Sequence, residues 1–181
     1  MKSKNLKELY FSEVRPNLKK DLGFKNEMAV PKMLKVTLDT GIGRFLKDEK
    51  AKDGIYNDLM IISGQKPKKC PAKRAIASFK TREGLIIGYK VTLRGQRMYD
   101  FLTRFINIVL PRTRDFRGLD LKGIDKGGNL NIGVKEQLAF PEISQESVHV
   151  IFGLGITVTT NSNNQKEAEA LFRALGFPFK K

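Results

Sequence analysis

Patterns typical of helices and patterns typical of strands follow one another along this chain without strict alternation. Apolar residues recur at helical spacing in four segments, 4–22, 48–62, 96–110 and 165–175. Strand-like alternation marks 32–38, 86–94, 130–134, 148–152 and 156–160, the last two as separate strands or one broken strand. Because this order lacks the regular repeat of a parallel α/β sheet, we predict an α+β fold of two layers, with a mainly antiparallel sheet and helices packed on one face.

The length of 181 residues suits one domain over 1–181, with protruding loops at about 66–84 and 111–147. Pro16 is expected to kink or split the first helix, and Pro111 to end the third. Asp48 is a candidate N-cap of the second helix, and Gly176 follows the last one.

Residues 65–82 are the most basic part of the chain, with seven basic and no acidic residues in 18 positions. We interpret 65–94 as two strands joined by a long basic loop. A charged loop can be merely solvated, but a long loop in a compact domain is more often functional. We therefore favour contact with nucleic acid, and Phe79 within the loop either packs in the core or stacks on a base or ribose.

The net charge of +15 points to a polyanionic partner, with nucleic acid ahead of a membrane surface. The excess is uneven, because 30 of the 34 basic and 15 of the 19 acidic residues lie in 1–140. The anion-binding surface is therefore expected from the first three quarters of the chain.

Several classes of protein do not fit this sequence. It has no apolar run of about 18 residues that would cross a membrane and no signal-peptide pattern at its start. One cysteine and one histidine cannot form an internal disulfide or a Cys/His zinc site, so we expect no metal and no cofactor. Cys70 as a nucleophile with His149 as its base is less plausible than a structural Cys70 and a structural or surface His149, and we expect no catalysis.

The segment Gly41-Ile42-Gly43 follows a strand and precedes a helix, as in a dinucleotide-binding fingerprint. The third glycine of that fingerprint would fall at Leu46, so the match is weak. We favour a plain strand-to-helix turn over a nucleotide-binding site. A third interpretation is that the glycines let an RNA phosphate approach the backbone closely.

The segment 111–118 resembles a rigid, charged protrusion with three arginines. Arginine suits bidentate contacts to phosphate or carboxylate. Since Asp115 offers an internal partner, local ion pairing and external binding remain equal alternatives here.

A set of co-linear motifs covers nearly the whole chain. They are ISGQKP at 62–67, AKRAIASFKTREG at 72–84, KVTLRG at 90–95, MYDFL at 98–102, LPRTRDFRG at 110–118, KEQ at 135–137, FPEI at 140–143 and GFPF at 176–179. In these motifs the chain resembles the bacterial-type large-subunit ribosomal protein L-five, the 5S-rRNA-binding family.

The resemblance implies a structural constituent of the large ribosomal subunit that binds 5S rRNA and helps attach it in the central protuberance. It further implies contact with P-site tRNA and an intersubunit bridge to small-subunit ribosomal protein thirteen. The other expected partners are large-subunit rRNA and neighbouring central-protuberance proteins. No association with a membrane is expected. The expected location is the bacterial cytoplasmic ribosome, with an organellar ribosome as an alternative.

The resemblance also suggests which residues serve each partner. For 5S rRNA we expect the first helix, the end of the first strand and the open sheet face, through Arg15, Asn17, Lys20, Lys35, Thr40, Gly41, Gly43, Lys66, Arg94 and Arg97. For tRNA we expect Lys73, Arg74, Phe79, Lys80 and Arg82. For the bridge we expect Arg112, Arg114, Asp115, Arg117, Pro141 and Glu142.

The family usually has Asn-Met-Gly-x-Gly after its first strand, where this chain has Asp39-Thr40-Gly41-Ile42-Gly43. An Asn amide donates a hydrogen bond to RNA, whereas an Asp carboxylate does not and is repelled by phosphate.

Two functions remain as alternatives. One is a free RNA chaperone or regulatory RNA-binding protein, and the other is an RNA-processing enzyme, against which the missing acid/base and metal constellation counts.

Overall fold

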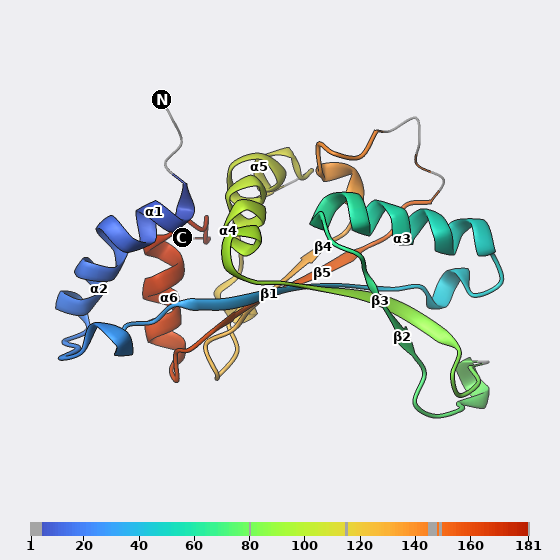
Figure 1. Cartoon of the computed structure of the whole chain (residues 1–181), viewed down its shortest axis with the longest axis horizontal. Coiled ribbons are helices and arrows are strands. Elements are labelled where there is room, and N and C mark those ends of the chain that lie inside the picture. The colour runs from blue at the N-terminus through green and yellow to red at the C-terminus, as the bar shows by residue number, and fades with distance from the viewer. Residues whose placement is uncertain (1–4, 80, 115, 145–147, 149, 181) are drawn as a thin grey trace. The chain divides into compact units, whose positions relative to one another are not determined.

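A computed structural model describes residues 5–79, 81–114, 116–144, 148 and 150–180 (Figure 1). Their contacts divide the chain into two compact units, each built from separate stretches of sequence. Unit 1 comprises Met1–Val36, Leu93–Ile132 and Thr157–Lys181, and unit 2 comprises Thr37–Thr92 and Gly133–Ile156. The single domain expected over 1–181 stays a prediction.

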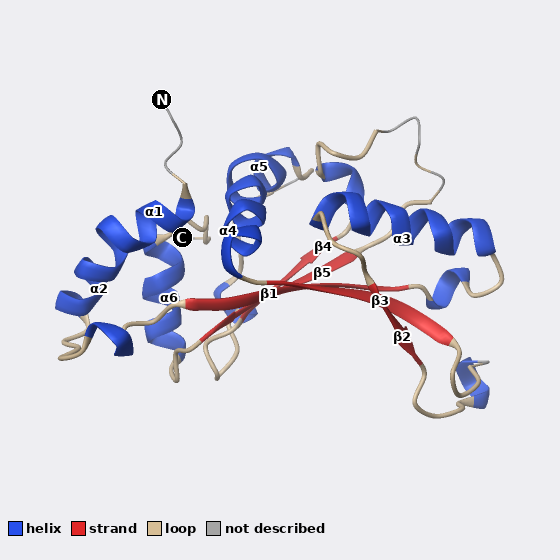
Figure 2. Ribbon diagram, in the orientation of Figure 1, coloured by secondary structure: helices blue, strands red, loops and turns tan. Residues whose placement is uncertain are grey.

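One sheet contains five strands in the order β2-β3-β1-β5-β4 (Figure 2). The strands are β1 Met33–Gly41, β2 Lys68–Pro71, β3 Ile86–Leu93, β4 Leu130–Val134 and β5 Leu154–Thr160. The sheet is antiparallel and helices pack alongside it, which confirms the predicted α+β class. The expected pair of strands within 65–94 is also present as β2 and β3.

The helices follow the predicted segments closely. They are α1 Leu6–Leu9, α2 Arg15–Asp21, α3 Glu49–Ser63, α4 Gly95–Arg104, α5 Leu110–Arg112 and α6 Gln165–Ala174. The apolar series predicted for 96–110 is buried throughout, at Met98, Phe101, Leu102, Phe105 and Val109. The periodicity therefore identified the face of this segment that packs in the core.

A π-helical turn precedes each of two prolines in helical segments. Tyr10–Val14 joins α1 to α2 ahead of Pro16, and Phe105–Val109 joins α4 to α5 ahead of Pro111. Each turn closes with an i to i−5 hydrogen bond, from the Arg15 N–H to the Tyr10 carbonyl and from the Leu110 N–H to the Phe105 carbonyl. The wider turn accommodates the proline ring, which would clash with the carbonyl four residues before it in a regular α-helix.

Two predictions about the ends of elements are wrong. Pro111 does not end its helix, because the preceding π turn makes room for its ring and the helix continues through α5 to Arg112. Of the described residues in 148–152, none belongs to a strand, and β5 begins only at Leu154. His149 lies outside the described residues.

In unit 2, helix α3 covers one side of the strands. The Asp48 carboxylate accepts a hydrogen bond from the Ala51 N–H at 3.1 Å, which confirms the predicted N-cap. Ile55, Leu59 and Ile62 are buried, and the Tyr56 ring meets the Tyr89 ring of β3 edge-on at 5.3 Å. Because successive strand residues point to opposite faces, Lys90 lies on the face away from α3.

In unit 1, the N-terminal helices are fastened to the chain that follows them. The buried Tyr10 hydroxyl donates a hydrogen bond to the Pro31 carbonyl at 3.0 Å. Burial raises the pKa of Tyr10 to about 12, so the phenol keeps its proton for this bond further into the alkaline range. Helix α6 ends at Ala174 and, as predicted, Gly176 follows it, with a φ of 86° in the left-handed conformation that glycine adopts readily.

Candidate nucleic-acid interface

The predicted long basic loop is an ordered extension of the β2–β3 hairpin in the part that the structure describes. Beyond the strands, the Ala72 N–H donates to the Leu85 carbonyl at 2.8 Å and the Gly84 N–H to the Ala72 carbonyl at 3.0 Å. Nearer the tip, Ile76 and Thr81 exchange backbone hydrogen bonds of 3.1 and 3.2 Å. The hairpin therefore holds its side chains on a hydrogen-bonded frame.

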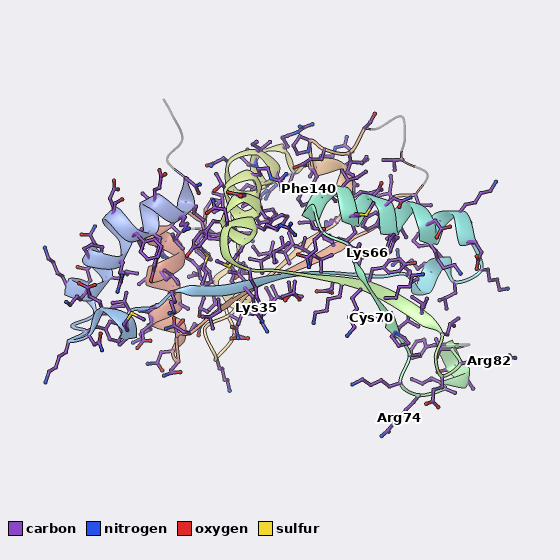
Figure 3. The ribbon with its side chains drawn as sticks, in the orientation of Figure 1. Lys35, Lys66, Cys70, Arg74, Arg82 and Phe140 are labelled. Atoms are coloured by element: carbon purple, nitrogen blue, oxygen red, sulfur yellow. The ribbon has the colours of Figure 1, made fainter. Side chains whose placement is uncertain are left out.

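The side chains of this hairpin are basic and exposed. Lys73, Arg74 and Arg82 are exposed, and within the described residues none of them has an ion-pair partner. Figure 3 shows Arg74 and Arg82 extending outward from the hairpin. Phe79 is 72% exposed, so it is not a core residue. Lys80, the fifth residue expected to contact tRNA, lies outside the described residues.

The strands of the hairpin also bring two like charges together. The β2–β3 register places Lys68 directly opposite Lys90, and both side chains are exposed. Like charges directly opposite one another in a sheet destabilise it by up to about 1 kcal/mol. A polyanion lying across the hairpin would relieve this repulsion.

At the end of β1 in unit 2, the backbone is more accessible to a ligand than the side chains are. Gly41 and Gly43 are exposed, and no atom lies within 4 Å of where a Cβ would stand at either position. Thr40, just before them, is buried, and its hydroxyl donates to the Gly153 carbonyl at 2.9 Å. The side chain of Thr40 is therefore committed to the fold, while the two glycines leave room for a ligand. Lys66 of the same unit is exposed.

Glycines also flatten the sheet face around Asp39. A Cβ on Gly155 would lie 2.9 Å from the Asp39 carboxylate, and a Cβ on Gly88 would lie 2.8 Å from the Thr40 carbonyl. A side chain at Gly88 is thus excluded by close approach of the β1 backbone, whereas one at Gly155 would require the Asp39 side chain to move. Asp39 itself is exposed on this face.

In unit 1, the residues expected to contact 5S rRNA differ in their freedom. Arg15 forms an ion pair of 3.1 Å with Glu27 and also donates to the Glu27 carbonyl at 3.4 Å. Asn17, Lys20, Arg94 and Arg97 are exposed, and Lys35 of β1 is half-buried. Arg15 therefore holds the chain after α2 in place, whereas the exposed residues are available to a partner.

The residues expected at an intersubunit bridge fall into both units. Arg112, Arg114 and Arg117 belong to unit 1 and are exposed, whereas Pro141 and Glu142 belong to unit 2. Asp115 lies outside the described residues, so the alternative of local ion pairing in 111–118 stays a prediction.

A glutamine to which the sequence analysis assigned no role organises the loop before β5. Gln137 is fully buried, its side-chain amide donates to the Val150 carbonyl at 2.6 Å, and its oxygen accepts from the Phe152 N–H at 2.9 Å. These two bonds satisfy backbone groups of the segment 150–152, which forms no strand and has no neighbouring strand to pair them. The KEQ motif contained this residue, but no local pattern reveals a partner so far along the chain.

Other kinds of site find little support in the structure. Among the described residues, no cluster of three or more His, Cys, Asp or Glu side chains is suited to holding a metal ion. Nor is any described helix long and apolar enough to span a lipid bilayer.

Two family models match the chain. One is described as "Ribosomal protein L5" and matches residues 26–82, and the other describes the C-terminus of the same ribosomal protein family and matches residues 86–179. Among curated proteins, "Large ribosomal subunit protein uL5" of Leptospira biflexa is 48% identical over 175 residues, covering 97% of this chain and 96% of its own length. Proteins of the same name from Ralstonia pickettii and Prochlorococcus marinus are each 50% identical, over 175 and 174 residues. They cover 97% and 96% of this chain, and 97% and 98% of their own lengths.

Proposed function

The chain belongs to the ribosomal protein L5 family of structural, non-enzymatic constituents of the large ribosomal subunit, and within this role we propose that it binds 5S rRNA and helps attach it in the central protuberance. The observations that carry this proposal are the like charges of Lys68 and Lys90, which face each other across β2 and β3, and the open backbone at Gly41 and Gly43. Such a surface is stable beside RNA phosphates and costs free energy without them.

We assign the 5S rRNA contacts to the exposed members of the expected set. In unit 1 these are Asn17, Lys20, Arg94 and Arg97, with the half-buried Lys35. In unit 2 they are Gly41, Gly43 and Lys66, where open backbone allows a phosphate or ribose to approach closely. Thr40 and Arg15 support these contacts indirectly, through their bonds to Gly153 and Glu27.

The tip of the hairpin is proposed to contact P-site tRNA through Lys73, Arg74, Phe79, Lys80 and Arg82. Its hydrogen-bonded frame supports this role, because an ordered arm loses little conformational entropy when it binds.

The bridge to small-subunit ribosomal protein thirteen is proposed for Arg112, Arg114, Asp115, Arg117, Pro141 and Glu142. Exposed arginines suit bidentate contacts to carboxylates of a protein partner. We place the protein on bacterial cytoplasmic ribosomes, in contact with large-subunit rRNA and neighbouring proteins of the central protuberance.

The test is a mobility shift of 5S rRNA against a structured RNA of equal size across a salt series. Phosphate contacts alone weaken equally for both RNAs as salt rises, whereas recognition of shape and unpaired bases retains a preference for 5S rRNA. A preference that persists supports the proposal. Equal binding that collapses for both RNAs together would instead favour a free RNA chaperone, and co-sedimentation with large subunits through a high-salt gradient would then fail as well.

A further inference from the structure

An open groove of about 880 Å³ lies in unit 2. One wall is the turn after β1, with Gly43 and Leu46, and the other is the β2–β3 hairpin. Its lining is mostly apolar, through Leu46, Pro71, Ile76, Phe79 and Ile87. The volume falls within the range of about 300–1,000 Å³ that is usual for sites that bind small organic groups.

Three apolar side chains of the groove are exposed to an unusual degree. Phe79 is 72% exposed, Ile76 46% and Ile87 37%. Phe79 ends a short 3₁₀ turn, Ala77–Phe79, and this turn lies inside the pair of hydrogen bonds that joins Ile76 to Thr81. The backbone therefore carries the ring on an ordered turn before any partner arrives, and a contiguous exposed apolar patch of this kind marks a binding surface.

The edge of the groove is cationic. Lys73 and Arg74 line it, and none of the described residues in the lining is acidic. Arg44 and Lys47 are exposed neighbours in sequence of Gly43 and Leu46 in the opposite wall. A partner that fits must present a flat apolar face and negative charge together. An RNA nucleotide does so, with its base and its phosphate.

We propose that this groove receives one unstacked nucleotide of an RNA chain, with its base against the Phe79 ring and its phosphate facing Lys73 and Arg74. The inference rests on the RNA-binding part of the proposed function and deepens it. The hairpin then recognises an unpaired nucleotide, whereas cations alone would follow the backbone of paired and unpaired RNA equally.

The test uses the full chain and a hairpin RNA with a single bulged 2-aminopurine, a fluorescent base. The same RNA with the 2-aminopurine in a base pair is the reference. We expect the bulged RNA to bind about tenfold more tightly and its fluorescence to be quenched on binding. Phe79→Ala should lose about this factor, since stacking of one base on an aromatic ring accounts for it. Phe79→Tyr should retain the affinity and Phe79→Leu should not.

The matched control is Phe11→Ala, which removes another exposed phenylalanine, 53% exposed, from unit 1. It should leave the quenching and the preference for the bulged RNA unchanged. Because Phe79 is exposed, its variants are expected to unfold at the same temperature as the wild type, which a thermal melt verifies.

Three results would overturn the inference. They are equal binding of bulged and paired RNA, full affinity in Phe79→Leu, and displacement of the RNA by micromolar AMP, which would identify a site for free nucleotides.

Failure of this inference can be distinguished from failure of the proposed function. Loss of the 5S rRNA preference in the wild type, with quenching on Phe79 intact, refutes the proposed function alone. A retained 5S preference with no effect of Phe79→Ala refutes the inference alone.

Discussion

The N-terminal helical segment and the β2–β3 hairpin are both rich in basic residues, but they differ in how those charges are balanced. In the first, Arg15 and Lys19 both approach the Glu27 carboxylate, at 3.1 and 3.8 Å. In the second, Lys68 faces Lys90 across the strands, and the tip cations have no ion-pair partner among the described residues. Part of the first set stabilises the protein's own fold, whereas the second leaves its charges without an ion-pair partner among the described residues. A count of basic residues would not have separated the two.

The largest effect is expected from removing the cations of the hairpin tip. The triple variant Lys73→Ala, Arg74→Ala and Arg82→Ala should weaken retention of P-site tRNA on reconstituted ribosomes roughly tenfold, because three phosphate contacts are lost. Binding of 5S rRNA should be nearly unchanged in the mobility shift. The control carries Lys122→Ala, Lys126→Ala and Lys166→Ala, which remove the same charge from exposed positions of unit 1. Equal loss of tRNA and 5S rRNA binding in the tip variant would contradict this division between surfaces.

The next effect concerns the frame of the hairpin. Gly88→Ala should lower the free energy of unfolding by roughly 1–3 kcal/mol, because the new Cβ would stand 2.8 Å from the Thr40 carbonyl. Urea denaturation measures this change. Gly41→Ala is the control, since nothing lies within 4 Å of its Cβ position, and its stability should stay within about 0.5 kcal/mol of the wild type. If Gly88→Ala were as stable as Gly41→Ala, the close approach of β1 and β3 would not matter for folding.

A smaller effect, of opposite sign for folding and binding, is expected from Lys68→Glu. The new carboxylate would face Lys90 and raise the free energy of unfolding by roughly 0.2–1 kcal/mol at low salt. The same change should weaken binding to 5S rRNA, because a cation near the phosphates becomes an anion. Parallel urea and mobility-shift titrations would test both signs. A variant that gained stability and bound RNA as tightly as before would show that this strand pair lies away from the RNA.

The smallest effect is expected where the charges are already paired. Glu27→Gln should cost at most about 1 kcal/mol of stability, since exposed ion pairs contribute little. It should raise affinity for 5S rRNA up to a few-fold, because Arg15 and Lys19 lose their anionic partner. Glu169→Gln, which breaks the 2.7 Å pair with Arg173 on α6, is the control for stability and should not raise RNA affinity. No gain in Glu27→Gln would mean that Arg15 and Lys19 stay away from RNA even when freed.

Local patterns predicted most of the elements, because each pattern reflects the burial of one face. The helix spacing of 48–62 anticipated the buried Ile55, Leu59 and Ile62, and Asp48 anticipated the start of α3. The burial of Thr40 was also available from the sequence, since it continues the series of Val36 and Leu38 on one face of β1. Its place among the RNA contacts is implied by the family resemblance and stays a prediction.

What could not be predicted depends on residues far apart in the chain. The Arg15–Glu27 pair requires the chain to turn back after α2, and the Gln137 bonds require the loop before β5 to lie beside a residue 13 positions earlier. The ordered frame of the basic loop arises from a few backbone hydrogen bonds, two between Ile76 and Thr81 and two that join Ala72 to Leu85 and Gly84. None of these produces a periodic signal, and each affects which charges a partner meets.

The double hydrogen bond of Gln137 has a consequence for mutation. Glutamine codons become glutamate codons by one base change, so Gln137→Glu is among the changes that this position meets most readily. A glutamate would still accept from the Phe152 N–H, but it would place a second acceptor against the Val150 carbonyl and a charge in a fully buried position. A single-nucleotide change at this codon would thus release the loop before β5 without altering any residue of the proposed RNA or protein contacts.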